Sequence, residues 1–229
     1  MKHYRSSLPK NARERVVATH IAGPQKYKAE YWMNRKLVGI RYFSPNGELQ
    51  SECPLKDGRR HGILYFFEDD PARVRSSEPW RNGLPHGVAR QYGGDGKLLG
   101  TYTMKHGTGL DLWWQDFPGG QAYLSEARYY CAGKLHGFEW WLEADQRHVW
   151  QERHFAENLL HGIERDWNSR GRVNRGYRRY WIRGRRVTKR QYLSACRKDP
   201  SLPRYRESDN KPFRNFPPEV AANLRPVTK

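Results

Sequence analysis

The chain has 229 residues, of which 37% are hydrophobic and 14% aromatic, and its formal net charge is +18. Because Trp and Tyr each bury a large area, this profile fits a thin, aromatic-rich sheet better than a thick globular core. No apolar run approaches the roughly 18 residues of a membrane span, and the three cysteines are far apart. We therefore expect a cytoplasmic chain with reduced thiols and with neither a signal peptide nor a membrane anchor.

The positive charge is concentrated at the two ends of the chain. Residues 1–33 hold seven Lys or Arg and two Asp or Glu, residues 34–167 hold 17 and 18, and residues 168–229 hold 18 and 4. The net charges of these segments are therefore +5, −1 and +14. An argument from charge thus concerns the carboxy-terminal segment and not the whole protein.

The chain is expected to begin with a flexible basic lead over residues 1–15. A strand, a turn and a second strand then follow at residues 16–20, at Gly23-Pro24 and at residues 28–32. The turn is indicated by the Gly-Pro pair, which interrupts regular structure.

A short phrase then recurs every 24 to 26 residues: a large apolar residue, two spacers, Gly and, in most copies, His-Gly. Its clearest copy runs from Trp80 through Gly83 to His86 and Gly87. Such a period is typical of repeat proteins, whose units stack into an extended surface. The apolar anchors of the copies are Leu55, Trp80, Met104, Tyr130, Phe155 and Trp181.

The residues after each phrase alternate in polarity with a period of two, which predicts β-strands with one apolar face. Fifteen of the eighteen positions that lie one, three and five residues after the closing Gly are apolar or aromatic. Asn46-Gly47 and Asp95-Gly96 predict tight hairpin turns of the primed types. We therefore expect an all-β fold, an elongated single-layer antiparallel meander of repeated β-hairpins. The closing glycines are Gly39, Gly62, Gly87, Gly109, Gly137 and Gly162.

The phrase is lost near the carboxy terminus, where a helical cap and a tail are expected. Residues 188–199 are predicted to form a short capping helix, because Thr188 and Gln191 have capping-box spacing. The helix would cover the last hairpin and protect its open edge. Six prolines interrupt residues 200–229, which predicts an extended or disordered basic tail. The repeat domain thus spans residues 16–187.

The phrase around Asn82-Gly83 and His86-Gly87 resembles the core of a MORN repeat (membrane occupation and recognition nexus). The resemblance covers residues 16–187 and implies a single-layer meander of hairpins used as a scaffold or recognition surface. Asn158 replaces the first Gly in one copy, and the turn is expected to survive because Asn tolerates positive φ. The looser copies resemble bacterial variant repeats that are grouped with antitoxins. The residues given a structural role in the repeat are Trp80, Gly83, His86, Gly87, Gly133, His136, Gly137, His161 and Gly162.

The recurring histidines raise a metal hypothesis, but strand geometry argues against it. Equivalent positions in successive hairpins lie two strands, or about 10 Å, apart, whereas zinc ligands lie about 2 Å from one ion. We expect each ring to bond a neighbouring backbone group in its turn. No catalytic or cofactor-binding motif is present, so we predict a protein that is not an enzyme and uses no cofactor or metal. The histidines concerned are His61, His86, His136 and His161.

Acidic side chains also recur at nearly equivalent strand positions, where they could form an acidic stripe. They could equally pair across strands with Arg41 and Arg165. The acidic residues concerned are Asp111, Glu139, Glu164 and Asp166.

Residues 170–190 contain ten basic residues and no acidic one, interleaved with aromatic side chains. Arg binds phosphate bidentately and aromatic faces stack on unpaired bases, which predicts a nucleic-acid interface. The competing interpretation is a basic edge strand and helix cap whose charge blocks sheet-to-sheet aggregation. The predicted interface residues are Arg170, Arg172, Arg175, Arg178, Arg179, Arg183, Arg185, Arg186, Lys189, Arg190, Tyr177 and Trp181.

The favoured function is a non-catalytic recognition scaffold that binds a protein partner on the repeat face and nucleic acid at its basic end. The alternative is an antitoxin or immunity-type protein that neutralises a toxin by direct binding, as the family resemblance implies. Binding to an anionic membrane surface is the weakest of the three hypotheses. The pattern does not specify an oligomeric state.

Overall fold

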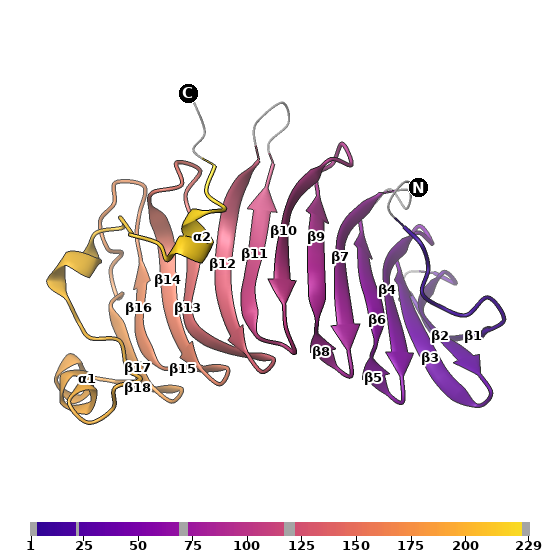
Figure 1. Ribbon diagram of the computed structural model, residues 1–229, viewed down its shortest axis with the longest axis horizontal. Coiled ribbons are helices and arrows are strands. Elements are labelled where there is room, and N and C mark those ends of the chain that lie inside the picture. The colour runs from indigo at the N-terminus through magenta and orange to yellow at the C-terminus, as the bar shows by residue number, and fades with distance from the viewer. Residues whose placement is uncertain (1–3, 22, 69–72, 117–121, 226–229) are drawn as a thin grey trace. The chain divides into compact units, whose positions relative to one another are not determined.

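The described chain folds into antiparallel β-hairpins, so the all-β prediction is confirmed (Figure 1). The chain divides into two compact units, residues 1–106 and residues 107–229, and each unit contains one sheet. The single predicted meander is therefore organised as two. The computed structural model describes residues 4–21, 23–68, 73–116 and 122–225.

The strands of the first sheet follow one another in chain order, and each neighbouring pair is antiparallel. Short strands β5 and β8 extend the pairing of β4 and β7. An antiparallel meander needs only tight turns between strands, which the short spacing of the repeat permits. The bounds are β1 Arg13–Thr19, β2 Lys26–Met33, β3 Lys36–Phe43, β4 Leu49–Lys56, β5 Arg59–Arg60, β6 Gly62–Phe67, β7 Val74–Arg81, β8 Leu84–Pro85, β9 Gly87–Tyr92 and β10 Leu98–Met104.

The second sheet has the same meander order, again with antiparallel neighbours. Short strand β15 extends the pairing of β14. The last strand, β18, lies at the edge, and the predicted helix follows it. The bounds are β11 Gly109–Gln115, β12 Tyr123–Cys131, β13 Lys134–Leu142, β14 Val149–Ala156, β15 Leu159–Leu160, β16 Gly162–Asp166, β17 Arg179–Ile182 and β18 Arg185–Val187.

Each phrase of the repeat forms a two-residue turn in which both central residues have positive φ. In the clearest copy Asn82 has φ 52° and Gly83 has φ 87°, the combination of a type I′ turn, which matches the twist of the two strands. Asn158 has φ 70° at the position of the missing Gly. The prediction that this turn survives is confirmed.

The Asn-Gly and Asp-Gly signals form hairpins, but of another turn type than predicted. Gly47 and Gly96 have φ of 81° and 76°, whereas Asn46 and Asp95 are not among the residues with positive φ. The amide of Gly47 bonds the carbonyl of Ser44 at 2.9 Å. A single positive φ at the last position is typical of a type I turn followed by a left-handed Gly. The primed turns lie at the opposite ends of the strands, in the repeat phrase.

The recurring histidines connect successive repeats through the backbone. The Nδ1 atom of His86 accepts from the amide of His106 at 3.1 Å, and that of His161 accepts from the amide of Arg183 at 3.1 Å. Both donors have positive φ in the turn of the following repeat. The predicted role of these rings in turn structure is thus confirmed at His86 and His161, and each ring holds the next turn, not its own.

The register of the strands divides the side chains between two faces of each sheet. Trp140 lies opposite Glu152, and Glu152 lies opposite Arg165, so these side chains share one face of the second sheet. The corresponding face of the first sheet carries Arg41, Glu52 and Tyr65, since Arg41 lies opposite Glu52 and Glu52 opposite Tyr65. We call this face the strap face, because a terminal segment of the chain crosses it in each unit.

The copy that closes with Gly39 departs from the predicted alternation. Arg41 lies opposite Glu52, and Glu52 opposite Tyr65, so Ile40 and Tyr42 point away from the strap face. Between Trp32 and Tyr31 the register of the β2–β3 pair shifts by one residue. A one-residue shift exchanges the two faces of a strand. The prediction that Ile40 and Tyr42 lie on the same face as the equivalent residues of the other copies is therefore wrong.

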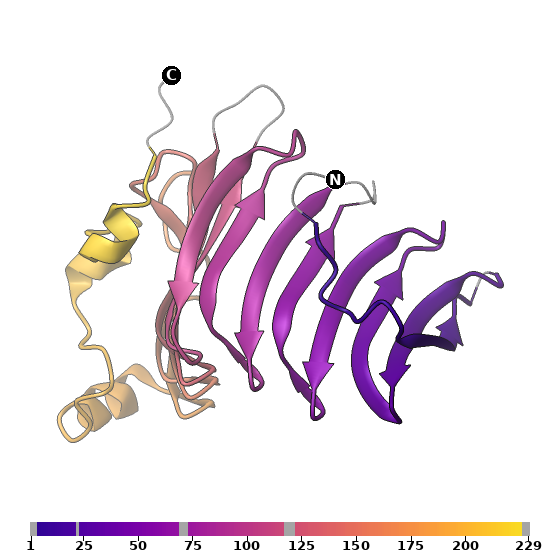
Figure 2. The ribbon, with the colours of Figure 1, turned by 45° about the vertical axis from the view of Figure 1, so that its right-hand side comes forward.

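The amino-terminal lead packs on the first sheet, contrary to the expectation of a flexible segment (Figures 1 and 2). The Tyr4 ring meets Tyr65 and Phe67 edge-on, with ring centroids 5.1 and 4.9 Å apart. Leu8 is buried in a cluster with residues of β2 and β3. The first strand begins at Arg13, ahead of the predicted residue 16. This basic segment is docked because it carries apolar side chains, and their burial against the sheet is favourable.

The predicted cap is present as α1 (Lys189–Cys196). The Thr188 side chain accepts from the amide of Gln191 at 3.3 Å, and the Gln191 side chain accepts from the amide of Thr188 at 2.9 Å. Tyr192 is fully buried and lies 5.2 Å from the Tyr180 ring of β17. The helix therefore covers the strap face of the last hairpin.

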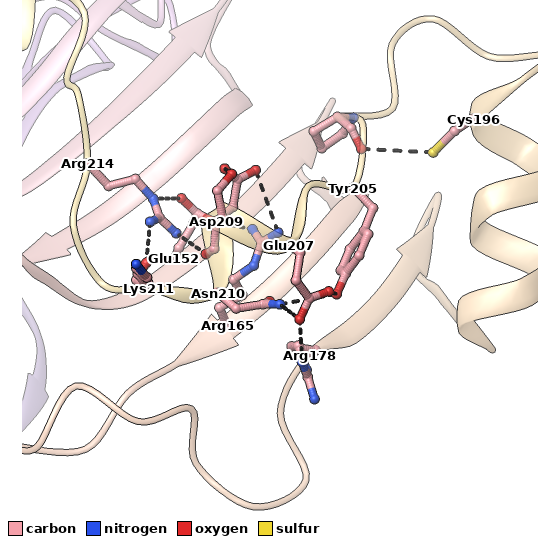
Figure 3. A network of polar contacts seen from close by, with 12 residues as sticks. Glu152, Arg165, Arg178, Cys196, Tyr205, Glu207, Asp209, Asn210, Lys211 and Arg214 are labelled. Atoms are coloured by element: carbon pink, nitrogen blue, oxygen red, sulfur yellow. Dashed lines mark hydrogen bonds and ion pairs between the residues drawn. The ribbon is translucent and has the colours of Figure 1, made fainter.

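The described part of the tail packs on the strap face of the second sheet, which corrects the prediction of an extended or disordered segment. It includes the 3-10 helix η1 (Glu207–Asn210) and the short helix α2 (Pro218–Ala221). The Phe216 ring lies edge-on to Trp140 at 5.6 Å, and Val220 is fully buried. We call residues 203–216 the C-terminal strap. Its Arg214 Nε donates to Glu152 at 2.7 Å (Figure 3).

Candidate functional site

The ten predicted basic residues lie on the connection between β16 and β17, on the last hairpin (β17 and β18) and on α1, and they do not converge on one point. Arg170 and Arg172 flank the left-handed Gly171 before β17, whereas Arg183 lies in the turn after it. Residues 173–178 and the strand β17 lie between these two groups in the chain. The predicted interface is therefore an edge and not a compact pocket.

Two of the predicted cations contact the C-terminal strap. Arg178 forms an ion pair with Glu207 at 3.8 Å, and Lys189 Nζ lies 4.0 Å above the ring of Tyr205. Both contacts fix the strap against the last hairpin. These side chains thus have a structural role that the sequence did not reveal.

The two predicted aromatic residues are engaged by their own chain. The Arg179 guanidinium lies 4.2 Å from the centroid of Tyr177 and 3.7 Å from Glu164. Trp181 Nε1 donates to Glu164 at 3.1 Å, and Arg186 lies opposite Trp181 in the edge pair. A base could stack only on the ring surface that these contacts leave open.

The remaining predicted cations are exposed and have no ion pair with a described carboxylate. A further exposed cation that the prediction missed, Arg197, lines a shallow hollow on α1 together with Arg190. Arg197 follows Arg190 by seven residues, about two helical turns, and this spacing could have predicted that both lie on the same side of the helix. We call the seven unpaired predicted residues the basic rim: Arg170, Arg172, Arg175, Arg183, Arg185, Arg186 and Arg190.

The other face of the second sheet carries a row of alternating charges that was not predicted from the sequence. Neighbours in the row lie opposite one another in consecutive strands, and Arg153 reaches Glu164 at 3.6 Å. Opposite charges on adjacent strands stabilise the pairing. We call this row the charge ladder and the face that carries it the ladder face. The ladder consists of Asp111, Arg128, Glu139, Arg153, Glu164 and Arg179.

The ladder corrects the predicted partners of the acidic residues. Arg41 and Arg165 lie on the strap faces, where Arg41 Nη2 donates to Glu52 at 2.7 Å and Arg165 Nη1 donates to Glu152. Asp166 accepts from the amides of the Gln151 and Asn174 side chains. No continuous acidic stripe forms along the described ladder, because the strand between two acidic positions supplies an Arg.

Glu139 is the exception within the charge ladder. Its neighbour Arg128 forms ion pairs with Asp111 at 3.2 Å and Glu126 at 3.4 Å. Glu139 is only 5% exposed, and one carboxylate oxygen has no hydrogen-bond partner. Burial, together with the nearby charge of Glu126, raises the pKa of Glu139 to about 7. The ladder face therefore contains one carboxyl group that changes charge near neutral pH.

The described residues do not offer a metal centre: no group of three His, Cys, Asp or Glu side chains among them could hold an ion. All three cysteines are free thiols. The helices that the structure describes are too short and too polar to cross a membrane. What the geometry offers is two surfaces, the basic rim and the ladder face.

Fold and surfaces together define the class: a β-hairpin repeat protein whose second unit has a basic edge. No protein-family model matches the chain, and no curated protein matches it. A crystal structure of a TarM mutant from S. aureus, in complex with Fondaparinux, alpha-GlcNAc-glycerol and UDP, is similar at 14% identity with a TM-score of 0.18. The match covers 58% of this chain and 20% of that one. So low a TM-score does not indicate a shared fold, and the ligands of that protein have no bearing on this chain.

Proposed function

We propose that this chain is a MORN-like, non-catalytic recognition scaffold of the cytoplasm, which binds nucleic acid at the basic rim and a protein partner at the ladder face. The observation that carries the proposal is the basic rim, whose Arg side chains are exposed and unpaired with described carboxylates. An Arg that already holds a carboxylate must give it up to bind phosphate. The rim residues have no such contact to lose.

Guanidinium groups bind phosphate through two parallel N–H groups, and each phosphate that they neutralise releases counterions. A chain of phosphates along the edge strand would therefore contact several rim residues at once. The competing interpretation, protection of the sheet edge by charge, needs no ligand and no salt-dependent binding. Salt-dependent binding of nucleic acid therefore distinguishes the two interpretations.

The test compares two charge-reversal variants by fluorescence anisotropy, with a labelled single-stranded RNA and a labelled duplex DNA. Three rim residues are changed to Glu in one variant, and three exposed cations of the first unit in the other. We expect the rim variant to lose at least about tenfold in affinity, with a salt slope lower by about two to three, whereas the control keeps most of both. Unchanged binding by the rim variant, or an equal loss in both, contradicts the proposal. The rim positions are Arg185, Arg186 and Arg190, and the control positions are Lys56, Arg81 and Lys105.

The ladder face supports the second part of the proposal, a protein partner. Its Trp141 is half-buried and carries the Arg153 guanidinium 5.0 Å from its ring centroid. Trp and Arg are enriched in the anchors of protein interfaces. The alternative function, an antitoxin that neutralises a toxin by direct binding, would use the same face.

A pull-down with and without nuclease treatment separates these functions. A partner held at the ladder face should persist after nuclease treatment, be lost in Trp141→Ala, and be kept in the rim variant. If co-expression of that partner is toxic and this chain relieves the toxicity, the antitoxin function is favoured. Partners that disappear with nuclease argue for the nucleic-acid function alone.

A further inference from the structure

A cleft of about 550 Å³ lies between the strap face of the second sheet and the C-terminal strap. Phe138, Trp140 and Arg165 contribute to its sheet side, and Arg204 and Lys211 belong to the strap side. The Phe138 and Trp140 rings are stacked at 5.1 Å. This volume is in the range of small-molecule sites, which combine apolar walls with a few polar groups.

Arg165 has unused hydrogen-bond donors in this cleft. The side chain is 3% exposed, and its Nη1 donates to Glu152. Its Nε and Nη2 atoms are buried and have no hydrogen-bond partner. These two groups are the adjacent pair through which a guanidinium holds two oxygens side by side. Buried donors without an acceptor are costly, so this pair indicates a site for an oxyanion.

The charged groups next to Arg165, one on the sheet and one on the strap, are already satisfied. Arg214 donates through Nε to Glu152 at 2.7 Å and through Nη2 to the backbone of Asp209 at 3.0 Å. Glu152 accepts from both Arg165 and Arg214 (Figure 3). Its negative charge is thus compensated within the protein. Among the described residues at the base of the cleft, Arg165 offers the donors that have no hydrogen-bond acceptor.

Positive charge dominates the cleft as a whole. The cleft is lined by five cationic side chains and by two carboxylates, those of Glu152 and Asp209. Arg204, Arg206 and Lys211 are exposed, and none forms an ion pair with a described carboxylate. They line the same cleft as Arg165. A dianion would leave the lined cleft near neutral.

We propose that this cleft binds a small phosphate monoester with an aromatic or apolar body. The phosphate occupies the Nε and Nη2 donors of Arg165, with Arg204 and Lys211 above it, and the body lies along Phe138. A carboxylate has two oxygens and would be satisfied by Arg165 alone. The third oxygen and second charge of a phosphate monoester use the additional cations of the strap. The cleft is separate from the basic rim, so the proposal does not depend on nucleic-acid binding.

Asp209 opposes binding at the same place. Its carboxylate lies 4.0 Å from Arg165 Nη2, and its side chain is 38% exposed. A bound phosphate would displace this contact and face the Asp209 charge. Removal of that charge should therefore tighten binding, an effect that a generally basic surface would not produce.

The experiment is isothermal titration of the full chain with phenyl phosphate, inorganic phosphate, benzoate and benzyl alcohol. We expect phenyl phosphate to bind at least about tenfold more tightly than each of the others, because only it uses both the donors and the apolar wall. Benzoate binding as tight as phenyl phosphate overturns the assignment to phosphate. Equal binding of phenyl phosphate and inorganic phosphate overturns the apolar body, and no binding of phenyl phosphate overturns the site.

Variants then test the residues. Arg165→Lys keeps a charge for Glu152 but loses the two-donor fork, and should weaken phenyl phosphate by about tenfold. Because Arg165 is buried, Arg204→Ser with Lys211→Ser is the second variant, and its exposed positions leave the fold intact. Asp209→Asn should tighten binding about threefold. The rim variant in which Arg185, Arg186 and Arg190 become Glu serves as the control.

The control should bind phenyl phosphate like the natural chain, even if nucleic-acid binding is lost. A loss in the control equal to that in the strap variant means that general surface charge, and not the cleft, attracts the ligand, and this overturns the proposal. Weaker binding by Asp209→Asn overturns it as well. Failure of the nucleic-acid function leaves all of these outcomes unchanged.

Discussion

Glu52 of the first sheet and Glu152 of the second hold the same place in the repeat, and each fixes a chain terminus on its own sheet. Glu52 lies opposite Tyr65, three residues after Gly62, and Glu152 lies opposite Arg165, three residues after Gly162. Both carboxylates are buried, with 0% and 2% exposure.

Each carboxylate is bound by an Arg of a neighbouring strand and by groups of the terminal segment. Tyr4 donates to Glu52 at 2.7 Å and Ser6 at 2.8 Å, whereas Arg214 donates to Glu152 at 2.7 Å. Burial by itself would raise the pKa of Glu152, but the hydrogen bond and charge of Arg214 lower it. Because the terminal segment supplies donors to the buried carboxylate, the carboxylate in turn holds that segment on the sheet.

The first prediction follows from this pairing. Glu152→Gln should free the C-terminal strap, and Glu52→Gln should free the lead, each with a loss of about 2 to 4 kcal/mol in the free energy of unfolding. Trypsin measures both effects, since Arg204 and Arg206 lie in the strap and Lys10 lies in the lead. Urea denaturation gives the stability.

The two variants are controls for each other. Glu152→Gln should speed cleavage in the strap and leave cleavage in the lead unchanged, and Glu52→Gln should do the reverse. Equal acceleration at both ends in either variant would mean global destabilisation and would contradict the separate docking of the termini.

The second prediction concerns two histidines of the repeat phrase. His161 is 1% exposed, accepts from the Arg183 amide and lies 3.0 Å from the hydroxyl of Ser201. His136 is exposed. His161→Ala should lower the free energy of unfolding by about 2 to 3 kcal/mol, since it leaves a cavity and an unpaired amide. His136→Ala should stay within about 0.5 kcal/mol. Similar losses in denaturant titrations of both variants would refute this distinction.

The third prediction addresses the turn that lacks its Gly. Asn158 has φ 70°, and its side-chain oxygen accepts from the amide of Leu135 at 2.7 Å. Asn158→Ala loses the hydrogen bond and replaces a residue that tolerates left-handed backbone by one that does not, which should cost about 1 to 2 kcal/mol. Asn158→Gly loses only the hydrogen bond, so it should cost less. Thermal unfolding measures both, and a more stable Ala variant would show that backbone strain is absent.

The fourth prediction concerns pH and the charge ladder. Burial and the charge of Glu126 raise the pKa of Glu139 from 4.5 to about 7, although Arg128 and Arg153 oppose the shift. Between these values the folded chain keeps a proton that the unfolded chain has released. The contribution of Glu139 to stability is therefore complete below about pH 4.5 and is lost as the pH rises through about 7.

The variant Glu139→Gln removes this titration. Its stability should exceed that of the natural chain by about 1 to 2 kcal/mol at pH 8, and the difference should shrink toward pH 5. The exposed Glu157→Gln is the control and should leave the pH profile unchanged. Parallel pH profiles of the natural chain and Glu139→Gln would mean that the Glu139 carboxyl is ionised throughout this range.

Local rules of backbone conformation carried the successful predictions. The hairpin period, the left-handed turn at Asn158 and the capping box of Thr188 and Gln191 each depend on neighbours within a few residues. The alternation of buried side chains was also local. It failed where a register shift between β2 and β3 exchanged the faces of Ile40 and Tyr42, and after Gly87, where Val88 is 39% exposed and Ala89 3%.

The surfaces were harder to predict, because they depend on residues distant in sequence. The basic segment was evident from charge alone, but the contact of Arg178 with Glu207 joins the last hairpin to the strap. The ladder required the register of consecutive strands, which set Arg128 and Arg153 on either side of Glu139. No short motif encodes such neighbours.

The sequence by itself determined the repeat, the turns, the helix cap and the location of excess charge, since these follow from backbone preference and composition. Only the tertiary structure decided where the termini lie and which cations remain free. The sequence predicted a flexible lead and a tail interrupted by prolines. In the structure Glu52 holds the lead and Glu152 holds the tail. A buried carboxylate must find its donors wherever the chain can supply them, and in this protein each terminal segment supplies some of them.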